Sequence, residues 1–344
     1  MKAVAKLRPE DGAMALIDVP EPKPAPGEAL IKITAGGICG TDVAIWHWHE
    51  AVVGQYAPNF PLIVGHEFAG MVVRPGPLGR AAAGDIVAVN PQIACGRCEY
   101  CALGRPTLCI DRRLMGGKIN GGWTEFVAVP EQNLYPLPKT VDSALAPLLE
   151  PLTVAVHAVV ERVPVHPGDV VAVIGAGPIG LLTAILARHA GARDVVITGI
   201  AADATRLALA RKLGCIPVNV EETDPVKVVR ALQWDGADIV YETSGNPAIF
   251  DQAVALARRT GRLGLIGLCR GPSTFTTTPL VLRELELIGS RGYNDTTWSL
   301  MTRLLPGVAS ELKTLVTHEL KLSEFETALQ LVERKEGMKI ILRP

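Results

Sequence analysis

The sequence predicts an α/β protein of two domains, in which a β-rich domain precedes a doubly wound parallel sheet. Its 344 residues exceed what one hydrophobic core usually organises. Up to about residue 150, short apolar segments alternate with turns rich in proline and glycine, as strands joined by irregular loops do. Beyond that point, apolar segments of strand length alternate with segments of helical periodicity, which is the βαβ pattern.

In the first domain, residues 29–34 and 85–89 are expected strands, because their apolar side chains alternate or run together between turn residues. The prolines and the glycine in residues 20–27 predict a loop between strands. The glycines and the proline in residues 76–84 predict the next connection.

In the second domain, residues 170–174 form a continuous apolar run, as expected for a strand buried on both faces. The elements expected next are helix 179–190, strand 195–198, helix 205–213, strand 216–218, helix 226–232, strand 238–241, helix 249–257 and strand 262–268. Residues 285–290 are the expected last strand. The tail from Asn294 is mixed and ends in an apolar segment, 339–342, that could return to the first domain. We therefore predict a first domain of residues 1–150 completed by 291–344, and a second domain of residues 151–290.

The composition describes a soluble globular protein, with 48% hydrophobic and 20% charged residues. A formal net charge of -1 gives no electrostatic basis for binding nucleic acid or an anionic membrane. The most apolar run, residues 170–187, is too short and too interrupted by glycine and proline to span a bilayer. The first residues contain no apolar region of the signal-peptide type, so we expect a cytoplasmic protein.

A glycine motif follows the first strand of the second domain. It matches G-x-G-x-x-G and comprises Gly175, Ala176, Gly177, Pro178, Ile179 and Gly180. The pattern alone is weak, but here it directly follows an apolar strand and opens an apolar helix. In that context the glycines permit a tight turn, close approach of a pyrophosphate and close helix packing. The sequence therefore predicts a dinucleotide site, and a glycine-rich turn without a ligand is the alternative.

The choice between NAD and NADP is left open by the end of the second strand of this domain. Gly199 stands where an acidic residue usually binds the ribose of NAD, and Asp203 follows four residues later. An arginine near this position is typical of NADP binding, and the nearest is Arg206, which could equally be a surface residue of its helix. We expect NAD, with NADP as the alternative.

Four of the seven cysteines form a cluster with the spacing C-x2-C-x2-C-x7-C: Cys95, Cys98, Cys101 and Cys109. In a reducing compartment, such a cluster favours a metal over disulfides. Four thiolates suit tetrahedral zinc in a closed structural site, and an iron–sulfur cluster is the alternative. Cys215 and Cys269 lie in or beside predicted strands, where we expect small core residues.

Cys39, His66 and Glu67 carry the thiolate, imidazole and carboxylate that can hold a catalytic zinc with one position open. Each residue alone is ambiguous, since a single cysteine is most often a core residue and a His-Glu pair most often lies at the surface. Their meaning depends on the other motifs of the chain.

Together, these features resemble the zinc-dependent medium-chain alcohol dehydrogenases over the whole chain and in the same order. Residues 37–42 and 65–67 are similar to the two zinc-ligand motifs of that family. Residues 150–157 are similar to a segment of the sorbitol (polyol) dehydrogenase branch, in which a glutamate replaces a cysteine ligand. The resemblance implies a GroES-like catalytic domain, a Rossmann domain for NAD(P) and two zinc ions per chain.

Residue by residue, the resemblance implies that the catalytic zinc is bound by Cys39, His66, Glu67 and Glu150, the last directly or through water. Thr41 would take the proton of the substrate hydroxyl, and Asp42 would orient the zinc-bound histidine. The family often has a proton-relay histidine three residues after the Ser/Thr position, where this chain has Ala44. His47 or His49 could replace it, although a surface role for both is the simpler expectation.

The implied activity is zinc-assisted hydride transfer between a polar secondary alcohol, such as a polyol, sugar or cyclitol, and NAD(P). The alternative substrate is L-threonine, because the stretch after Cys39 is also similar to L-threonine 3-dehydrogenases. A non-catalytic nucleotide-binding relative is the alternative of another class. Family members are commonly dimers or tetramers, so we expect a homodimer or homotetramer, with residues 263–268 and 285–288 as candidate pairing strands. The expected partner is otherwise a small alcohol or ketone.

Overall fold

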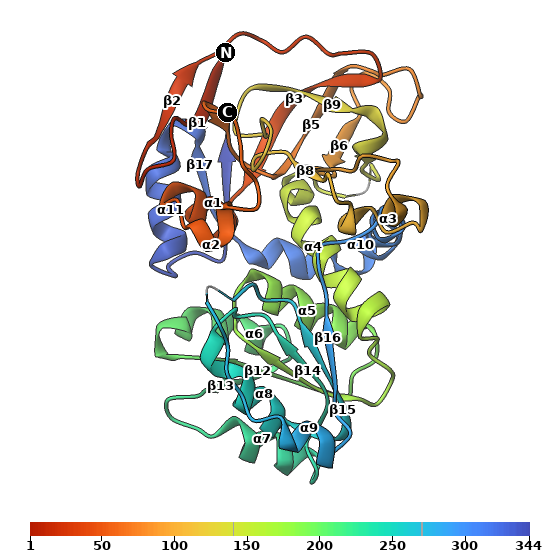
Figure 1. The fold of residues 1–344 in the computed structure, drawn as a ribbon, viewed down its shortest axis with the longest axis vertical. Coiled ribbons are helices and arrows are strands. Elements are labelled where there is room, and N and C mark those ends of the chain that lie inside the picture. The colour runs from red at the N-terminus through yellow and green to blue at the C-terminus, as the bar shows by residue number, and fades with distance from the viewer. Residues whose placement is uncertain (140, 270) are drawn as a thin grey trace. The chain divides into compact units, whose positions relative to one another are not determined.

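The structure, a computed structural model, describes residues 1–139, 141–269 and 271–344 and has the α/β fold class that the sequence predicted. Its contacts divide the chain into two compact units. Unit 1 comprises Met1–Glu150 and Asn294–Pro344, and unit 2 comprises Pro151–Tyr293. Figure 1 shows that the ends of the chain both belong to unit 1.

Unit 1 is built around a seven-stranded sheet with β3 (Glu28–Gly37) at its centre. The order is β10 (Leu134–Pro136), β6 (Ile86–Val89), β5 (Glu67–Arg74), β3, β18 (Lys339–Arg343) and β17 (Val316–Lys321), and β9 (Phe126–Pro130) also pairs with β3. β3 pairs with β5 in antiparallel register from Leu30 opposite Arg74 to Gly37 opposite Glu67. This register places the residues that follow Gly37 beside the first residue of β5.

The remaining elements of unit 1 flank this sheet. A three-stranded sheet has the order β2 (Met14–Asp18), β1 (Lys2–Lys6) and β4 (Leu62–Ile63), and a small ribbon joins β7 (Gln92–Ile93) to β8 (Arg113–Leu114). Its shorter helices are α1 (Gly40–Trp46), α2 (Glu50–Val53), α3 (Glu99–Ala102), η1 (Pro106–Leu108), η2 (Glu131–Asn133) and η3 (Ser143–Leu148). The prolines of residues 20–27 lie in the connection between β2 and β3, as predicted.

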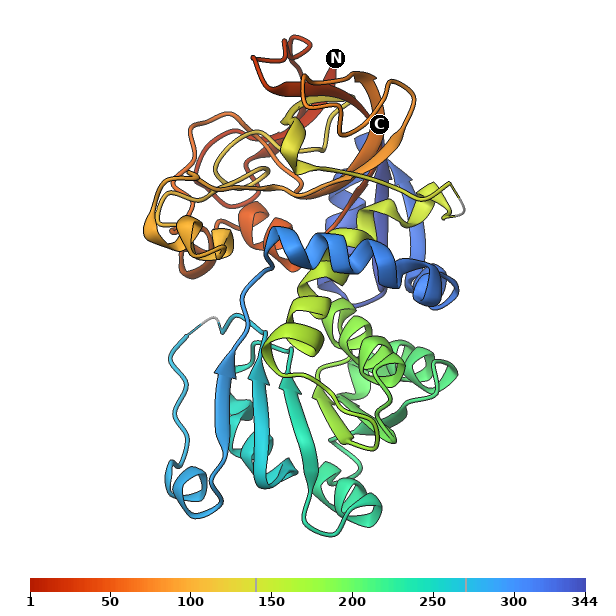
Figure 2. The ribbon, with the colours of Figure 1, turned by 90° about the vertical axis from the view of Figure 1, so that its right-hand side faces the viewer.

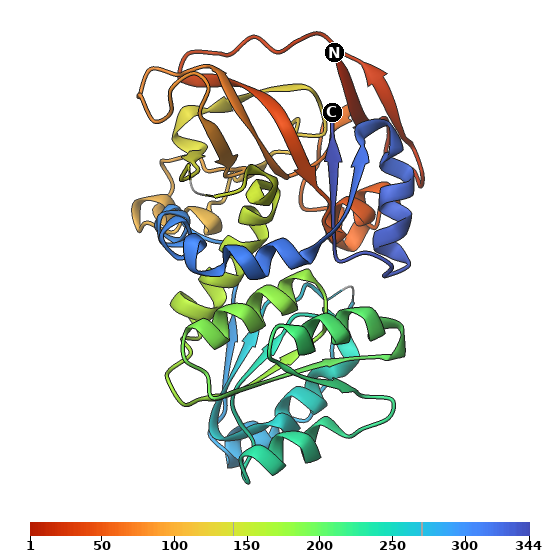
Figure 3. The ribbon, with the colours of Figure 1, turned by 180° about the vertical axis from the view of Figure 1, so that it is seen from behind.

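The C-terminal part of unit 1 contains a long helix that the sequence reading missed. α10 (Asp295–Leu315) is followed by β17, η7 (Leu322–Glu324), α11 (Phe325–Glu333) and β18. Its buried side chains recur at helical spacing: Thr297, Trp298, Met301, Leu305, Val308, Leu312 and Leu315. Pro306, on the exposed side of the helix, interrupts that pattern in the sequence. β17 and β18 lie side by side next to α11 (Figure 3).

Unit 2 is a parallel sheet with the order β13 (Ile216–Asn219), β12 (Asp194–Gly199), β11 (Val170–Ile174), β14 (Ala237–Glu242), β15 (Ala257–Leu265) and β16 (Glu286–Gly289). All five neighbouring pairs are parallel. Figure 2 shows β14, β15 and β16 side by side. The helices are α4 (Leu149–Val156), which begins at the boundary between the units, η4 (His157–Arg162), α5 (Pro178–His189), η5 (Ala201–Asp203), α6 (Ala204–Lys212), α7 (Pro225–Leu232), η6 (Pro247–Ile249), α8 (Phe250–Leu256) and α9 (Thr278–Leu282). The doubly wound order predicted from the βαβ pattern is confirmed.

One core prediction was wrong. Cys215 is buried, as expected, but Cys269 is only partly buried. The reason is that β15 ends at Leu265, whereas the sequence suggested a strand to residue 268. Cys269 therefore lies beyond the sheet.

The helical stretch Ser143–Arg162 is long and apolar enough to cross a membrane by length and composition. However, 72% of its most apolar window is buried inside the protein, which is also what a core helix shows.

We expect Trp298→Ala to destabilise the protein by about 3–5 kcal/mol, because the change opens a cavity in the core. Trp298 is fully buried and stacks on Tyr135 with 4.8 Å between ring centroids. Arg303→Ala, at an exposed position of the same helix, should change stability by less than about 0.5 kcal/mol. Urea unfolding followed by tryptophan fluorescence and circular dichroism measures both, and equal effects would contradict the packing role of α10.

Candidate active site and metal centres

Three of the predicted catalytic ligands meet at the end of the β3–β5 pair. Cys39 is the N-cap residue of α1, two residues after the end of β3, and His66 precedes Glu67 at the start of β5. One ligand atom from each of Cys39, His66 and Glu67 lies within 4.8 Å of the others. His66 is 5% and Glu67 is 1% exposed, so the group is largely shielded from solvent. A thiolate, an imidazole and a carboxylate at this separation fit a single divalent ion such as zinc.

The turn before His66 depends on a glycine and a tryptophan. Gly65 has a φ of +87°, and a side chain there would overlap the ring of Trp123. Trp123 is 1% exposed and donates its indole N–H to the carbonyl of Gly37 at 3.1 Å. Trp123 thus connects the end of β3 with the turn that carries His66. The sequence offered no signal for this role, because a tryptophan in a glycine-rich stretch has many uses.

Asp42 contacts both the cysteine and the histidine of the group. Its Oδ2 atom accepts a hydrogen bond from the backbone N–H of Cys39 at 2.8 Å, and its Oδ1 atom lies 3.4 Å from Nδ1 of His66. Burial is the largest single influence and disfavours a charged His66, but the charges and hydrogen bonds of Asp42 and Cys39 together outweigh it and raise the pKa of His66 well above its ordinary value. The contact at Nδ1 leaves Nε2 of His66 as the nitrogen that can face an ion.

Lys339 is a residue of this site that the sequence reading did not identify. It is the first residue of β18, is 2% exposed, forms an ion pair with Glu67 and donates to the carbonyl of Ile38 at 3.1 Å. Glu67 therefore contacts Lys339 as well as lying close to the two other candidate ligands. The sequence contained only a weak signal, a lysine opening an otherwise apolar strand, and it did not show which residue would face that lysine.

Two further predicted residues lie in the same unit. The Thr41 hydroxyl is 3.8 Å from the Cys39 sulfur, which places it at the edge of the ligand group. Glu150, in the first turn of α4, is partly buried and lies outside the group of ligand atoms found among the described residues. Its role as a direct or water-mediated ligand remains a prediction.

The histidines near Ala44 differ in their surroundings. His47 is held between two carboxylates, with Nδ1 2.7 Å from Asp11 and Nε2 3.1 Å from Glu333. Both ring nitrogens are thus engaged, which leaves no free nitrogen for a proton relay. His49 is exposed at the N-cap of α2, and Ala44 is buried.

The four clustered cysteines also converge, with one sulfur from each within 4.8 Å of the others. Positive φ angles at Gly96 (72°) and Gly104 (69°) bend the loop around them. Backbone N–H groups of Ile110 and Cys101 lower the pKa of Cys98 to about 6. Burial and the neighbouring Cys98 raise the pKa of Cys101 to about 12, so the pKa values within the cluster point in opposite directions. The convergence of four sulfurs is what fits zinc.

The glycine motif forms the turn from β11 into α5. Gly175 has a φ of +104°, and a side chain at Gly180 would overlap the carbonyl of Gly175. Gly177, the N-cap residue of α5, faces open space, and Pro178 is the first helical residue, followed by Ile179. An open position at the N-terminus of a twelve-residue helix fits a pyrophosphate, which helix N–H groups and the helix dipole attract.

At the end of β12, Asp203 and Arg206 face each other. The Asp203 carboxylate accepts from the N–H of Ile200 at 3.2 Å and lies 3.4 Å from the Arg206 guanidinium. Their side chains are 9% and 11% exposed. Both side chains are therefore largely buried, and Asp203 packs closely against Gly199. A Cβ atom built on Gly199 would lie 3.1 Å from Cβ of Asp203.

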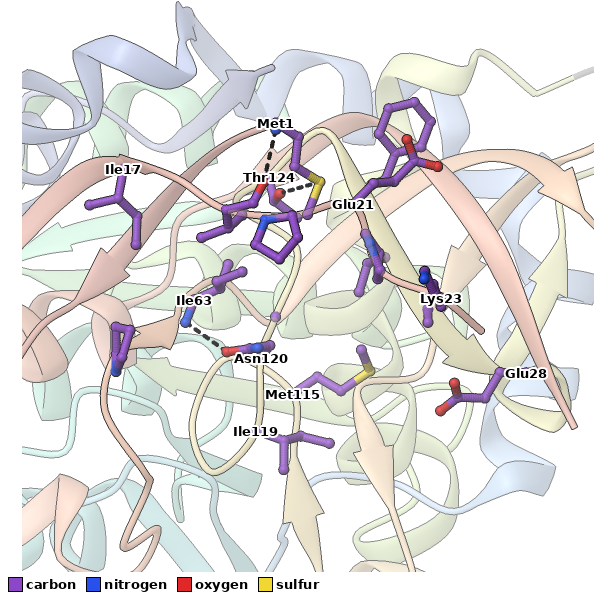
Figure 4. Close-up of a pocket in the computed structure, with 18 of the residues that line it drawn as sticks. Met1, Ile17, Glu21, Lys23, Glu28, Ile63, Met115, Ile119, Asn120 and Thr124 are labelled. Atoms are coloured by element: carbon purple, nitrogen blue, oxygen red, sulfur yellow. Dashed lines mark hydrogen bonds between the residues drawn. The ribbon is translucent and has the colours of Figure 1, made fainter. Parts of the chain in front are cut away.

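A cavity of about 620 Å³ also lies in unit 1 (Figure 4). Its lining is mainly apolar and includes Ile17, Ile63, Met115 and Ile119, with Asn120 bonded to the N–H of Ile63 at 3.0 Å. None of the candidate metal ligands lines this cavity, so it is separate from the ligand group.

Comparison with known proteins finds two family models that match the chain. Residues 25–139 match the alcohol dehydrogenase GroES-like domain, and residues 178–306 match the zinc-binding dehydrogenase domain. The chain is 36% identical to an L-threonine 3-dehydrogenase of Bacillus subtilis, covering 100% of this chain and 99% of that protein. The chain belongs to the zinc-dependent medium-chain alcohol dehydrogenase family.

Two further family members are similar over the full length. A sorbitol dehydrogenase of Halalkalibacterium halodurans is 33% identical, covering 100% of this chain and 99% of the relative. The crystal structure of a putative zinc-binding dehydrogenase from Sinorhizobium meliloti, bound to NADP, has a TM-score of 0.90 at 30% identity, covering 100% of this chain and 99% of that one. The chain described here is thus an NAD(P)-dependent oxidoreductase of the alcohol and polyol dehydrogenase type, acting on a small molecule.

We expect Asp42→Asn to weaken binding of the ion at Cys39 and His66 by about 10- to 100-fold, because the residue orients both ligands. Competition with a zinc-sensitive chelator dye measures this affinity without reference to turnover. Asp18→Asn, on an exposed carboxylate, is the control and should leave the affinity unchanged. An unchanged affinity in Asp42→Asn would show that the carboxylate does not position the ligands.

Proposed function

We propose that this dehydrogenase oxidises a polar secondary alcohol, such as a polyol, sugar or cyclitol, to the ketone with NAD, using a zinc ion held by Cys39, His66 and Glu67. The supporting observation is the approach of these three ligand atoms to within 4.8 Å at the end of the β3–β5 pair. In this assignment, Glu150 reaches the ion directly or through water.

The residues around the ion have separate tasks in this proposal. Zinc, when bound, supplies Lewis acidity that favours loss of the alcohol proton near neutral pH, and NAD accepts the hydride. Thr41 lies 3.8 Å from the Cys39 sulfur and takes the hydroxyl proton. Lys339 neutralises Glu67 whenever that carboxylate is not on the ion, so that no unpaired charge is left in the buried site. Because His47 is engaged by two carboxylates, the proton leaves through water or the cofactor ribose rather than through His47.

A second zinc in the cysteine cluster has a structural role in this proposal. Four thiolates fill all four positions of a tetrahedral ion and leave none for substrate. The ion would hold the loop from Cys95 to Cys109 together, since this loop contains only the short helices α3 and η1.

The glycine turn and the end of β12 make up the dinucleotide site in this proposal. Gly175, Gly177, Pro178, Ile179 and Gly180 receive the pyrophosphate at the start of α5. Gly199 and the Asp203–Arg206 pair form the base of the ribose pocket.

The second candidate substrate is L-threonine, because an L-threonine 3-dehydrogenase is among the similar full-length relatives at 36% identity. The replacement of the expected relay histidine by Ala44 weakens this reading. Nicotinamide reduction assayed with polyols, cyclitols and L-threonine, each with NAD and NADP, decides between them.

We expect Cys39→Ala to lower kcat/KM by at least about 10³-fold, since the lost Lewis acidity contributes several kcal/mol to the transition state. Metal analysis should find about two zinc ions in the wild type and about one in Cys39→Ala. Cys98→Ser is the matched variant and should lose the other ion and thermal stability. Visible absorption would indicate an iron–sulfur cluster instead, and undiminished turnover in Cys39→Ala would refute the proposed function.

We further propose a homodimer or homotetramer in which β16 pairs across a two-fold axis. The other predicted pairing strand, residues 263–268, is not available, because β15 pairs with both β14 and β16 inside the sheet. β16 is one of the two edge strands of the unit 2 sheet, Leu287 on it is 40% exposed, and Val281 and Leu282 of the preceding α9 are 76% and 77% exposed. An edge strand with apolar neighbours readily pairs with another chain.

We expect Leu287→Asp to weaken self-association by at least about tenfold, because it buries a charge at the pairing edge. Light scattering over a dilution series measures the mass. Leu78→Asp makes the same change at a 62% exposed position of unit 1 and should leave the mass unchanged. An unaltered mass for Leu287→Asp would exclude the β16 edge as the interface.

A further inference from the structure

The position whose acidic side chain usually selects NAD is occupied by a glycine in this chain, with little room for a larger side chain. β12 ends at Gly199, which has no side chain to accept the ribose hydroxyls. A Cβ built on Gly199 would lie 3.1 Å from Cβ of Asp203 and 3.2 Å from Cδ2 of Leu207. Larger side chains are therefore hindered there. If a carboxylate recognises the ribose, it comes from another element.

Asp203 is poorly placed to be that carboxylate. One of its oxygens accepts from the N–H of Ile200 and the other faces the Arg206 guanidinium. The same ion pair keeps Arg206 from offering its charge to the 2'-phosphate of NADP. Because both side chains are about nine-tenths buried, they shape the floor of the site and do not project from it.

Glu221 supplies a carboxylate to this position from the neighbouring strand. β13 runs parallel to β12, with Asn219 opposite Gly199, so the loops that follow the two strands lie at the same edge of the sheet. Glu221 follows β13 by two residues, and its Oε2 atom accepts a hydrogen bond from the N–H of Ala201 at 2.7 Å. Its side chain is exposed, and a carboxylate with one such bond can still accept several more.

An exposed cation of α6 lies against a different group of residues. Arg211, in the last turn of α6, lines a cavity of about 450 Å³ together with Glu222 and Asn219. Residues 199–203 are not part of that lining. Residues 200–203, the loop after β12, contain no basic side chain and bind the fixed Glu221 carboxylate at the N–H of Ala201, an arrangement that suits ribose hydroxyl groups and repels a phosphate.

We propose that Glu221 is the residue that selects NAD over NADP in this chain, by accepting the hydroxyl groups of the adenosine ribose and repelling a 2'-phosphate. The role usually provided by the end of the second strand has moved to the loop after the third. This inference rests on the proposed function, in which the protein uses NAD.

The test is equilibrium binding of NADH and NADPH to the purified full-length protein, followed by the fluorescence of the reduced nicotinamide. This measurement needs neither substrate nor turnover. The wild type should bind NADH more tightly than NADPH by on the order of 100-fold, since like charges brought together cost several kcal/mol and 1.4 kcal/mol is tenfold.

Glu221→Gln retains a carbonyl that can accept from Ala201 and removes only the charge, so the loop should keep its conformation. In this variant the preference for NADH should fall at least tenfold, through tighter NADPH and weaker NADH binding. Glu222→Gln is the matched control, because it removes the same charge at the next residue. The Glu222 side chain lines the cavity with Arg211, away from the loop after β12, so this variant should leave the preference unchanged.

The outcomes separate this inference from the function on which it rests. Wild-type preference for NADPH, an unchanged preference in Glu221→Gln, or an equal shift in Glu222→Gln would each overturn the role of Glu221 while leaving a nucleotide-dependent enzyme. Failure of the wild type to bind either nucleotide would overturn the proposed function itself, and the inference with it.

Discussion

The ion pair between Lys339 and Glu67 connects the last strand of the chain to the candidate metal site. Both side chains are almost fully buried, and the two residues are 272 positions apart in the sequence. A buried charge without a partner is strongly unfavourable, and removing one partner of such a pair typically costs about 3–5 kcal/mol. The site therefore depends on β18 lying beside β3, which also brings Lys339 to the carbonyl of Ile38 next to Cys39.

The two candidate metal centres differ in how they are assembled. All four cysteines of the cluster lie between residues 95 and 109, so a short loop carries the complete ligand set. The group of Cys39, His66 and Glu67 combines the end of β3, the start of β5 and, through Lys339, the start of β18. Local unfolding of the C-terminal strand would consequently disturb the candidate ligands Cys39, His66 and Glu67, whereas the four cysteines would remain close together in one short loop.

The sequence contained enough to predict what depends on short spacing. The strands and helices of the βαβ pattern, the glycine turn before α5 and the cysteine loop are each specified by residues close together in the sequence. The structure contains all of these expected elements. Cys39 and His66 were predictable as a pair only through family resemblance, because the register between β3 and β5 brings them together. Trp123 and Lys339 could not be predicted, since their roles arise from contacts between distant strands. The helix α10 was missed because Pro306 lies within its apolar repeat, on an exposed face where it does not disrupt the packing.

In the role proposed for Glu221, the missing acid at the end of β12 does not imply a missing function. The usual sequence motif places the glycine turn after the first strand and the acid at the end of the second. In a parallel sheet, however, the loops after several strands lie at the same edge. Gly199 and Glu221 lie at the ends of adjacent strands, and the bond between Glu221 and the N–H of Ala201 fixes the carboxylate beside the vacant position. The charge at this edge of the sheet therefore depends on the loops of both strands together. The sequence order of its residues matters less than the strand order, which here places β13 next to β12.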